Sequence, residues 1–152
     1  MFYFTYSEAL PAGKQGEAAD RLAQKMLDAL AYEAYEETQF LAWSFRGKHH
    51  YQWYKNRGLC AVQWDDVVVQ LDLKNQGNST VSVQGQPYLG ADKELLINKA
   101  LAYFNNDSFW LVAPYKVFDA GVERRLVSQE NDSDALLVSY TSGGTTPGDS
   151  YL

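Results

Sequence analysis

The sequence predicts an α+β fold, in which a strongly bent antiparallel sheet, close to a half-barrel, carries two helices over its concave face. Three observations support this prediction. An amphipathic stretch at residues 16–34 has helical spacing, and five short segments between residues 38 and 85 alternate with a period of two. Aromatic residues make up 14% of the chain, with 4 Trp and 11 Tyr. Aromatic side chains favour strands, and a long antiparallel sheet of this kind tends to curl.

Composition and charge narrow the class of partner. At 152 residues the chain is long enough for one domain with a buried core. Hydrophobic residues make up 46% and charged residues 21%, as is usual for a globular domain. The formal net charge is −6, and the basic residues form no run longer than Arg124-Arg125. Because binding to phosphates requires a basic patch, the sequence argues against nucleic acid as a partner.

The first 15 residues differ from the rest. They begin "MFYFTYSEALPAG", with an aromatic start that turns polar. This stretch is shorter than the roughly 20 apolar residues of a membrane span, and it lacks the basic start and long apolar core of a signal peptide. Two interpretations remain: a residual piece of a removed anchor, or a first strand or flexible arm. Residues 16–152 are predicted to form a single domain.

The first predicted helix covers residues 16–34. Leu22, Met26, Ala29 and Leu30 form an apolar stripe that we expect to face the core. The polar side of this helix is not basic, which argues against a helix lying on a membrane surface.

The five predicted strands follow in order, separated by short turns. Leu41, Trp43 and Phe45 share one face of the first strand, and His49, Tyr51 and Trp53 share one face of the second. "LCAVQW", "VVVQLDL" and "STVSVQG" supply the other three, with turns at "GK", "NRG", "DD" and "GN". Glycine, asparagine and aspartate suit such turns, so the pattern indicates an antiparallel meander.

A second helix is predicted from Asp92 to Asn105, with an apolar face that includes Leu96, Ala100 and Phe104. "FWLVAP" then predicts a buried segment that Pro114 ends. "GVERRLVS" and "DALLVSYTS" indicate a hairpin across the loop "QENDSD". The final "SYL" resembles the start of a further strand, so we expect the domain to be truncated at its C-terminus.

Few residues have a pattern typical of catalysis or metal binding. His49 and His50 point to opposite faces of one strand, so they are not expected to share an ion. Cys60 is a lone cysteine in a strand, and Asp65, Asp66, Asp107 and Asp119 form no recognisable acid–base pair. The sequence therefore predicts no metal, no cofactor and no enzymatic activity. An enzyme that uses Asp107 or His49 is the weakest of the alternatives.

Two stretches resemble a known family. "NDSFWLVAPYKVFDAG" and "YTSGGTTPGDSYL", with "EAADRLAQKMLDAL" and "WSFRGKHHYQWY" upstream, resemble an uncharacterised family of envelope proteins, chiefly of Bacteroidota. The family is similar in organisation to the lipoprotein-carrier fold of LolA and LolB. The resemblance implies a LolA-like sheet that receives acyl chains, a periplasmic location, an N-terminal membrane anchor and further strands after Leu152. No family residue is carried over to a catalytic or ligand role.

The leading prediction is a non-enzymatic protein of the cell envelope that binds a lipid or lipid-like apolar ligand in the concavity of the sheet. The alternative is a structural or interaction module with a filled core and no small-molecule ligand. The cavity wall is predicted to contain Trp43, Phe45, Tyr51, Trp53, Trp64, Leu96, Ala100, Phe104, Phe109 and Trp110.

Overall fold

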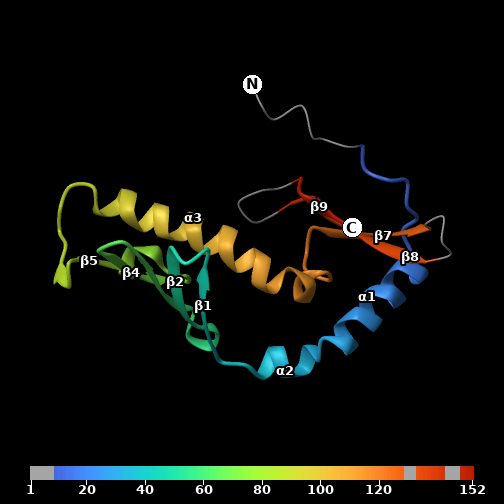
Figure 1. Ribbon diagram of the computed structural model, residues 1–152, viewed down its shortest axis with the longest axis horizontal. Coiled ribbons are helices and arrows are strands. Elements are labelled where there is room, and N and C mark those ends of the chain that lie inside the picture. The colour runs from blue at the N-terminus through green and yellow to red at the C-terminus, as the bar shows by residue number, and fades with distance from the viewer. Residues whose placement is uncertain (1–8, 129–132, 143–147) are drawn as a thin grey trace. The chain divides into compact units, whose positions relative to one another are not determined.

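The computed structural model describes residues 9–128, 133–142 and 148–152, and it confirms an α+β fold with antiparallel sheets. The chain divides into two compact units (Figure 1). Unit 1 contains the residues up to Tyr32 together with those from Pro114 onward, and unit 2 contains Glu33–Ala113. The sequence predicts a single domain over residues 16–152. Because the chain divides into two units, each unit is described by itself.

Unit 2 is built on a six-stranded antiparallel meander in sequence order. Its strands are β1 (Phe40–Phe45), β2 (His49–Tyr54), β3 (Leu59–Trp64), β4 (Val67–Asp72), β5 (Thr80–Val83) and β6 (Gln86–Pro87). The five predicted strands are confirmed, and β6 adds a short sixth. Short 3-10 helices, η1 (Lys55–Arg57) and η2 (Gln76–Asn78), connect β2 to β3 and β4 to β5.

Two tight turns of this sheet place both central residues in the left-handed region of the backbone. Arg46 and Gly47 have φ values of 51° and 65°, and Gln84 and Gly85 have φ values of 51° and 75°. Turns of this kind match the right-handed twist of the strands that they join. They keep neighbouring strands in register, so that residues of one parity all face the same side.

The helix α3 (Lys93–Val112) packs on one side of this sheet, mainly against β3, β4 and β5. The predicted end at Asn105 is wrong, because the helix continues through "FW" to Val112 and passes into the 3-10 helix η3 (Ala113–Lys116). Two adjacent asparagines weaken a helix only slightly. Buried contacts of Asp107 and Ser108 in the next turn outweigh that weakness, and the helix ends just before Pro114.

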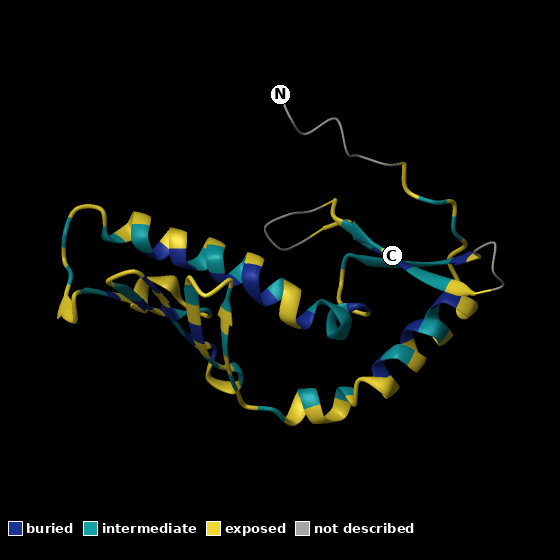
Figure 2. Ribbon diagram, viewed as in Figure 1, coloured by how far each residue is buried: buried dark blue, intermediate teal, exposed yellow. Residues whose placement is uncertain are grey.

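The core of unit 2 lies between α3 and the sheet. Ile97, Ala100 and Phe104 recur along the buried side of α3, and buried and exposed positions alternate along the strands (Figure 2). They meet a set of buried strand residues: Tyr51, Cys60, Val62, Trp64, Val69, Leu71 and Val81. Burial of this apolar surface is the main force that holds α3 on the sheet.

Unit 1 pairs the first helix with a small sheet. The helix α1 (Glu17–Ala29) packs on β7 (Val122–Ser128) and β8 (Asp134–Tyr140), and β9 (Ser150–Tyr151) pairs with β8. The predicted final hairpin and the strand at "SYL" are therefore confirmed, while most of the loop "QENDSD" lies outside the described residues. The two helices pack on different sheets, so the expectation that both cover the same sheet is wrong.

The buried face of α1 also differs from the prediction. Ala19, Ala23 and Leu27 are buried, whereas Ala29 and Leu30 are exposed. Small alanines at a spacing of four allow the helix backbone to approach the sheet closely, which the predicted stripe of larger residues did not indicate. The helix stops at Ala29, and after Ala31, at a φ of 51°, a short helix α2 (Tyr32–Glu37) begins.

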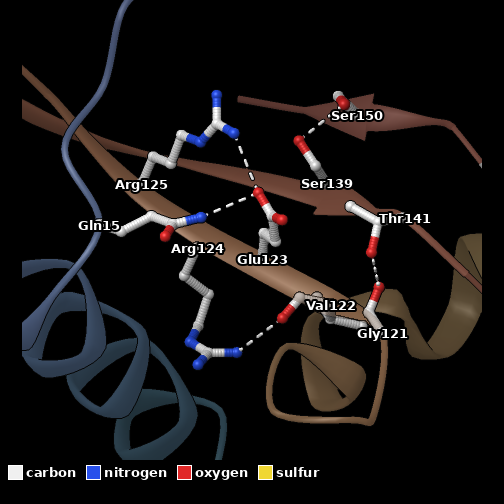
Figure 3. A network of polar contacts seen from close by, with 9 residues as sticks. All are labelled: Gln15, Gly121, Val122, Glu123, Arg124, Arg125, Ser139, Thr141 and Ser150. Atoms are coloured by element: carbon white, nitrogen blue, oxygen red, sulfur yellow. Dashed lines mark hydrogen bonds and ion pairs between the residues drawn. The ribbon is translucent and has the colours of Figure 1, made fainter.

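Polar contacts attach the segment before α1 to β7. The backbone of Lys14 pairs with that of Leu126 in an antiparallel bridge. The carboxylate of Glu123 accepts hydrogen bonds from the side chains of Gln15 and Arg125, each at 2.9 Å (Figure 3). The guanidinium of Arg124 donates to Asp20 of α1 at 2.7 Å. The described part of the N-terminal arm is thus bound to unit 1.

Candidate functional site

The structure places most of the predicted cavity wall in or against the core of unit 2. Tyr51, Trp64, Ala100 and Phe104 are buried within it. Trp43, Phe45, Trp53 and Leu96 are partly buried and pack against it. These eight of the ten predicted residues are therefore brought together on the side of the sheet that faces α3.

The two remaining residues lie elsewhere. Phe109 and Trp110 belong to the last turns of α3, outside this core cluster, and their rings meet edge to face with centroids 6.2 Å apart. Trp110 is 61% exposed. The sequence predicts both residues in the cavity wall, within a buried segment that follows the helix, whereas the structure places them in the last turns of the longer helix α3.

One margin of the core stays partly exposed. Because α3 packs mainly on β3, β4 and β5, the helix covers the aromatic residues of β1 and β2 less completely. We call Trp43, Phe45 and Trp53 the aromatic margin. The ring of Phe104 on α3 lies 5.2 Å from that of Trp53 and 6.4 Å from that of Trp43. The margin thus joins the core beneath α3 to the open edge strand β1.

The aromatic margin also contains two unsatisfied donors. The indole Nε1 atoms of Trp43 and Trp53 are buried and have no hydrogen-bond partner among the described residues. A buried donor without an acceptor is unfavourable and uncommon in folded proteins. These two donors mark the least well satisfied part of the core.

A buried polar cluster lies on the same side of the sheet. Asp107, which is 2% exposed, accepts a hydrogen bond of 2.5 Å from the hydroxyl of Tyr51, and its Oδ2 lies 2.6 Å from Nδ1 of His49. Asn106 donates to the other carboxylate oxygen at 2.8 Å. We call His49, Tyr51 and Asp107 the Asp107 cluster. His49 and Asp107 are 58 residues apart in the sequence, and no local sequence pattern indicates that they meet.

The Asp107 cluster resembles part of a catalytic triad, in which an aspartate orients a histidine. A nucleophile bonded to the histidine would complete such a triad. Among the described residues, the only hydrogen-bond partner of the His49 side chain is Asp107. The ring of His49 stacks on that of Tyr103, with centroids 3.9 Å apart. All these contacts join β2 to α3, so they hold the helix on the sheet.

Burial changes the acid–base properties of two groups in this core. Burial, and then the hydrogen bond to Asp107 and its charge, hold the pKa of Tyr51 well above the usual value. Burial likewise raises the pKa of the Cys60 thiol to about 12. Cys60 therefore lacks the accessible thiolate that a nucleophile or a metal ligand requires.

The opposite side of the sheet carries a hollow of about 520 Å³. Most of its lining comes from the residues of β1 to β4 that point away from α3. His50 belongs to this face, where its Nδ1 lies 2.7 Å from the hydroxyl of Ser44. His49 and His50 thus face opposite sides of β2, as the sequence predicts. The full lining is Ala42, Trp43, Ser44, His50, Tyr51, Gln52, Ala61, Gln63, Val68 and Gln70.

Among residues 9–128, 133–142 and 148–152, no group of three or more His, Cys, Asp or Glu side chains is arranged to hold a metal ion. No helix in these same residues has both the length and the apolar character needed to cross a membrane.

Comparisons with known proteins leave the family open. No family model matches the chain, and neither a curated protein nor a solved structure matches it. The resemblance to envelope proteins stays a prediction.

Replacing Asp107 tests how strongly the Asp107 cluster holds α3. Asp107→Ala leaves the buried donor of Tyr51 and the partly buried donor of His49 without an acceptor, so we expect a loss of about 3 kcal/mol in the free energy of unfolding. Urea unfolding followed by tryptophan fluorescence measures this, because all four tryptophans lie in unit 2. Asn98→Ala, at an exposed position of α3, is the control and should change stability by less than about 0.5 kcal/mol. Equal stability of the two variants would contradict a structural role for Asp107.

The raised pKa of Tyr51 predicts a loss of stability in alkali. An unfolded tyrosine releases its proton near about pH 10, whereas folded Tyr51 retains it because its pKa is raised. Above that pH the folded state therefore binds more protons than the unfolded state, and stability falls as the pH rises. Urea unfolding in steps from about pH 8 to about pH 11 should show a shallower decline for Tyr51→Phe than for the parent. Identical slopes would show that Tyr51 is not the group responsible.

Proposed function

We propose that the chain is a non-enzymatic binding protein that takes a lipid or lipid-like apolar ligand at the aromatic margin of unit 2. The observation that carries the proposal is the uneven cover of the apolar sheet face. Tyr51, Trp64 and Ala100 are 0–5% exposed and already packed, whereas Trp43, Phe45 and Trp53 remain partly exposed beside α3. The ligand would lie along the helix at β1, with the filled core beside it.

The chemistry of the margin suits an apolar chain. Its three side chains are aromatic, and Leu41 of the same strand face is also partly buried. Removing such surface from water stabilises a complex by about 25 cal/mol per Å². The buried indole donors of Trp43 and Trp53 have no acceptor among the described residues, and a carboxylate or ester oxygen of a lipid would supply one. A LolA-like bent sheet and a periplasmic, membrane-anchored location belong to this proposal and rest on the family resemblance.

Fluorescence quenching by a brominated fatty acid tests the proposal. Because every tryptophan lies in unit 2, binding at the margin should quench the parent protein in a saturable way. Phe45→Gln removes apolar area at the margin and should weaken binding by about threefold to tenfold.

Leu95→Gln is the matched control, since Leu95 lies on α3 and is 70% exposed. It should bind the fatty acid as tightly as the parent. Quenching that does not saturate, or equal weakening by both substitutions, would contradict a site at the aromatic margin.

The second candidate is an interaction module with a filled core, and the open edge of β1 favours it. Phe40–Phe45 reads "FLAWSF", without a charged residue or a proline. It lies at one end of the six-stranded order and pairs only with β2 among the described residues. Natural edge strands of this length usually carry charged side chains or are covered by a helix or loop, which prevents pairing with other chains. The uncharged edge of β1 is therefore suited to pairing with an extended strand of a partner polypeptide.

Strand addition can be tested with peptides selected from a random library for binding to the protein. Peptides that pair with β1 should protect the backbone amides of Phe40–Phe45 from hydrogen exchange. Phe40→Lys places a charge on this edge, at a position that is 44% exposed, and should abolish binding while leaving fatty-acid quenching intact. Protection confined to other strands would rule out the edge as the docking site.

A further inference from the structure

The sheet face turned away from α3 has its own chemical character. The hollow of about 520 Å³ lies within the range of volumes found for small-molecule sites. Its ten lining residues contain no Asp, Glu, Lys or Arg. Since charged residues make up 21% of the chain, a random set of ten would hold about two. The solvent-facing side of an antiparallel sheet is usually polar. A hollow that is polar but contains no charged side chain is less common, and it distinguishes this face from the rest of the acidic chain.

The polar groups of the hollow are amides and one hydroxyl–imidazole pair. Gln52, Gln63 and Gln70 come from three neighbouring strands, and among the described residues none of their side chains has a hydrogen-bond partner. Each amide offers both donors and an acceptor. Ser44 and His50 are hydrogen-bonded to each other at 2.7 Å, which fixes their orientation at one side of the hollow.

The strand register places these groups in two rows. His50 lies opposite Ser44 and Gln63, while Gln52 lies opposite Ala42 and Ala61. The small alanines leave room between the longer amides. The rows therefore form a shallow floor with hydrogen-bonding groups that project around it.

An aromatic platform continues this face along the strands. Tyr54 follows Gln52 by two residues, so its side chain points to the same side about 7 Å further on. Its ring lies 4.8 Å from that of Phe40 on β1. The two residues are 39% and 44% exposed. Exposed rings next to uncharged amides form a surface with both apolar and hydrogen-bonding parts.

We propose that this outer hollow is a binding site for an uncharged polyhydroxylated ligand, a short segment of a neutral glycan. Adjacent sugar hydroxyls can pair with the donor and acceptor of one glutamine amide, while the apolar face of a sugar ring packs on Tyr54 and Phe40. The lining of the hollow offers no opposite charge to an anionic or cationic ligand. Arg57 borders the aromatic platform, since its guanidinium carbon lies 5.6 Å from the centroid of the Tyr54 ring. This site lies on the other face of the sheet from the aromatic margin, and of that margin only Trp43 is among its lining residues.

The test is titration of the ¹⁵N-labelled full chain with maltohexaose, cellohexaose and chitohexaose, with hexagalacturonate as an acidic comparison. The side-chain amide signals of Gln52, Gln63 and Gln70 should shift in a saturable way with at least one neutral probe and not with hexagalacturonate. Gln52→Ala and Gln63→Ala should each weaken that binding by at least about threefold. Both positions are exposed, so the fold is retained.

Gln86→Ala is the matched control, because Gln86 is an exposed glutamine of β6 outside the hollow, and it should bind like the parent. The proposal is overturned if no neutral probe shifts the three amides, if hexagalacturonate binds as well, or if Gln86→Ala weakens binding as much as Gln63→Ala. Quenching of Gln63→Ala by the brominated fatty acid should match that of the parent. A failure of the glycan proposal is therefore distinguishable from a failure of the lipid proposal.

Discussion

The buried carboxylate of Asp107 is the constraint on which the arrangement of unit 2 depends. Apolar burial draws α3 onto the sheet, but it is not directional. A carboxylate that is 2% exposed requires donors at short range, and Tyr51 and His49 of β2 supply them. Asp107 lies on the same buried side of α3 as Ile97, Ala100 and Phe104, so its contacts with β2 constrain the rotation and axial position of the helix.

The same placement divides the sheet into surfaces with different properties. With Asp107 bonded to β2, the helix lies mainly over β3 to β5, so the centre of the apolar face is filled and its margin at β1 is only partly covered. The outer face is left to side chains of the opposite parity, including Gln52 and Gln63. An apolar ligand and a hydroxyl-rich ligand would therefore meet different faces of one sheet. Of the Asp107 cluster, Tyr51 stacks on Trp43 of the aromatic margin, with ring centroids 4.5 Å apart, and also lines the outer hollow.

Local patterns predicted the strands well and the helices less well. Period-two alternation from Leu41 to Val83 and the turn residues between the segments are local signals, so the meander could be predicted. The end of α3 could not, because Asn105-Asn106 suggests a stop and the contacts of Asp107 that override it come from a distant strand. For α1, the size of the side chains determines the buried face more than their hydrophobicity does, because the small Ala19 and Ala23 face the sheet. The meeting of His49 and Asp107 likewise depends on how the helix crosses the sheet.

The paired histidine and aspartate raise the question of catalysis, and their surroundings favour a structural interpretation. Both oxygens of Asp107 accept hydrogen bonds, from Asn106 on one side and from Tyr51 with His49 on the other. A catalytic histidine must reach a reacting group with its second nitrogen, and among the described residues the only hydrogen-bond partner of the His49 side chain is Asp107. The ring of His49 also stacks on Tyr103, so a change in its position would disturb the contact between helix and sheet. A group that fixes the fold in this way is better suited to hold binding surfaces in place than to move with a substrate.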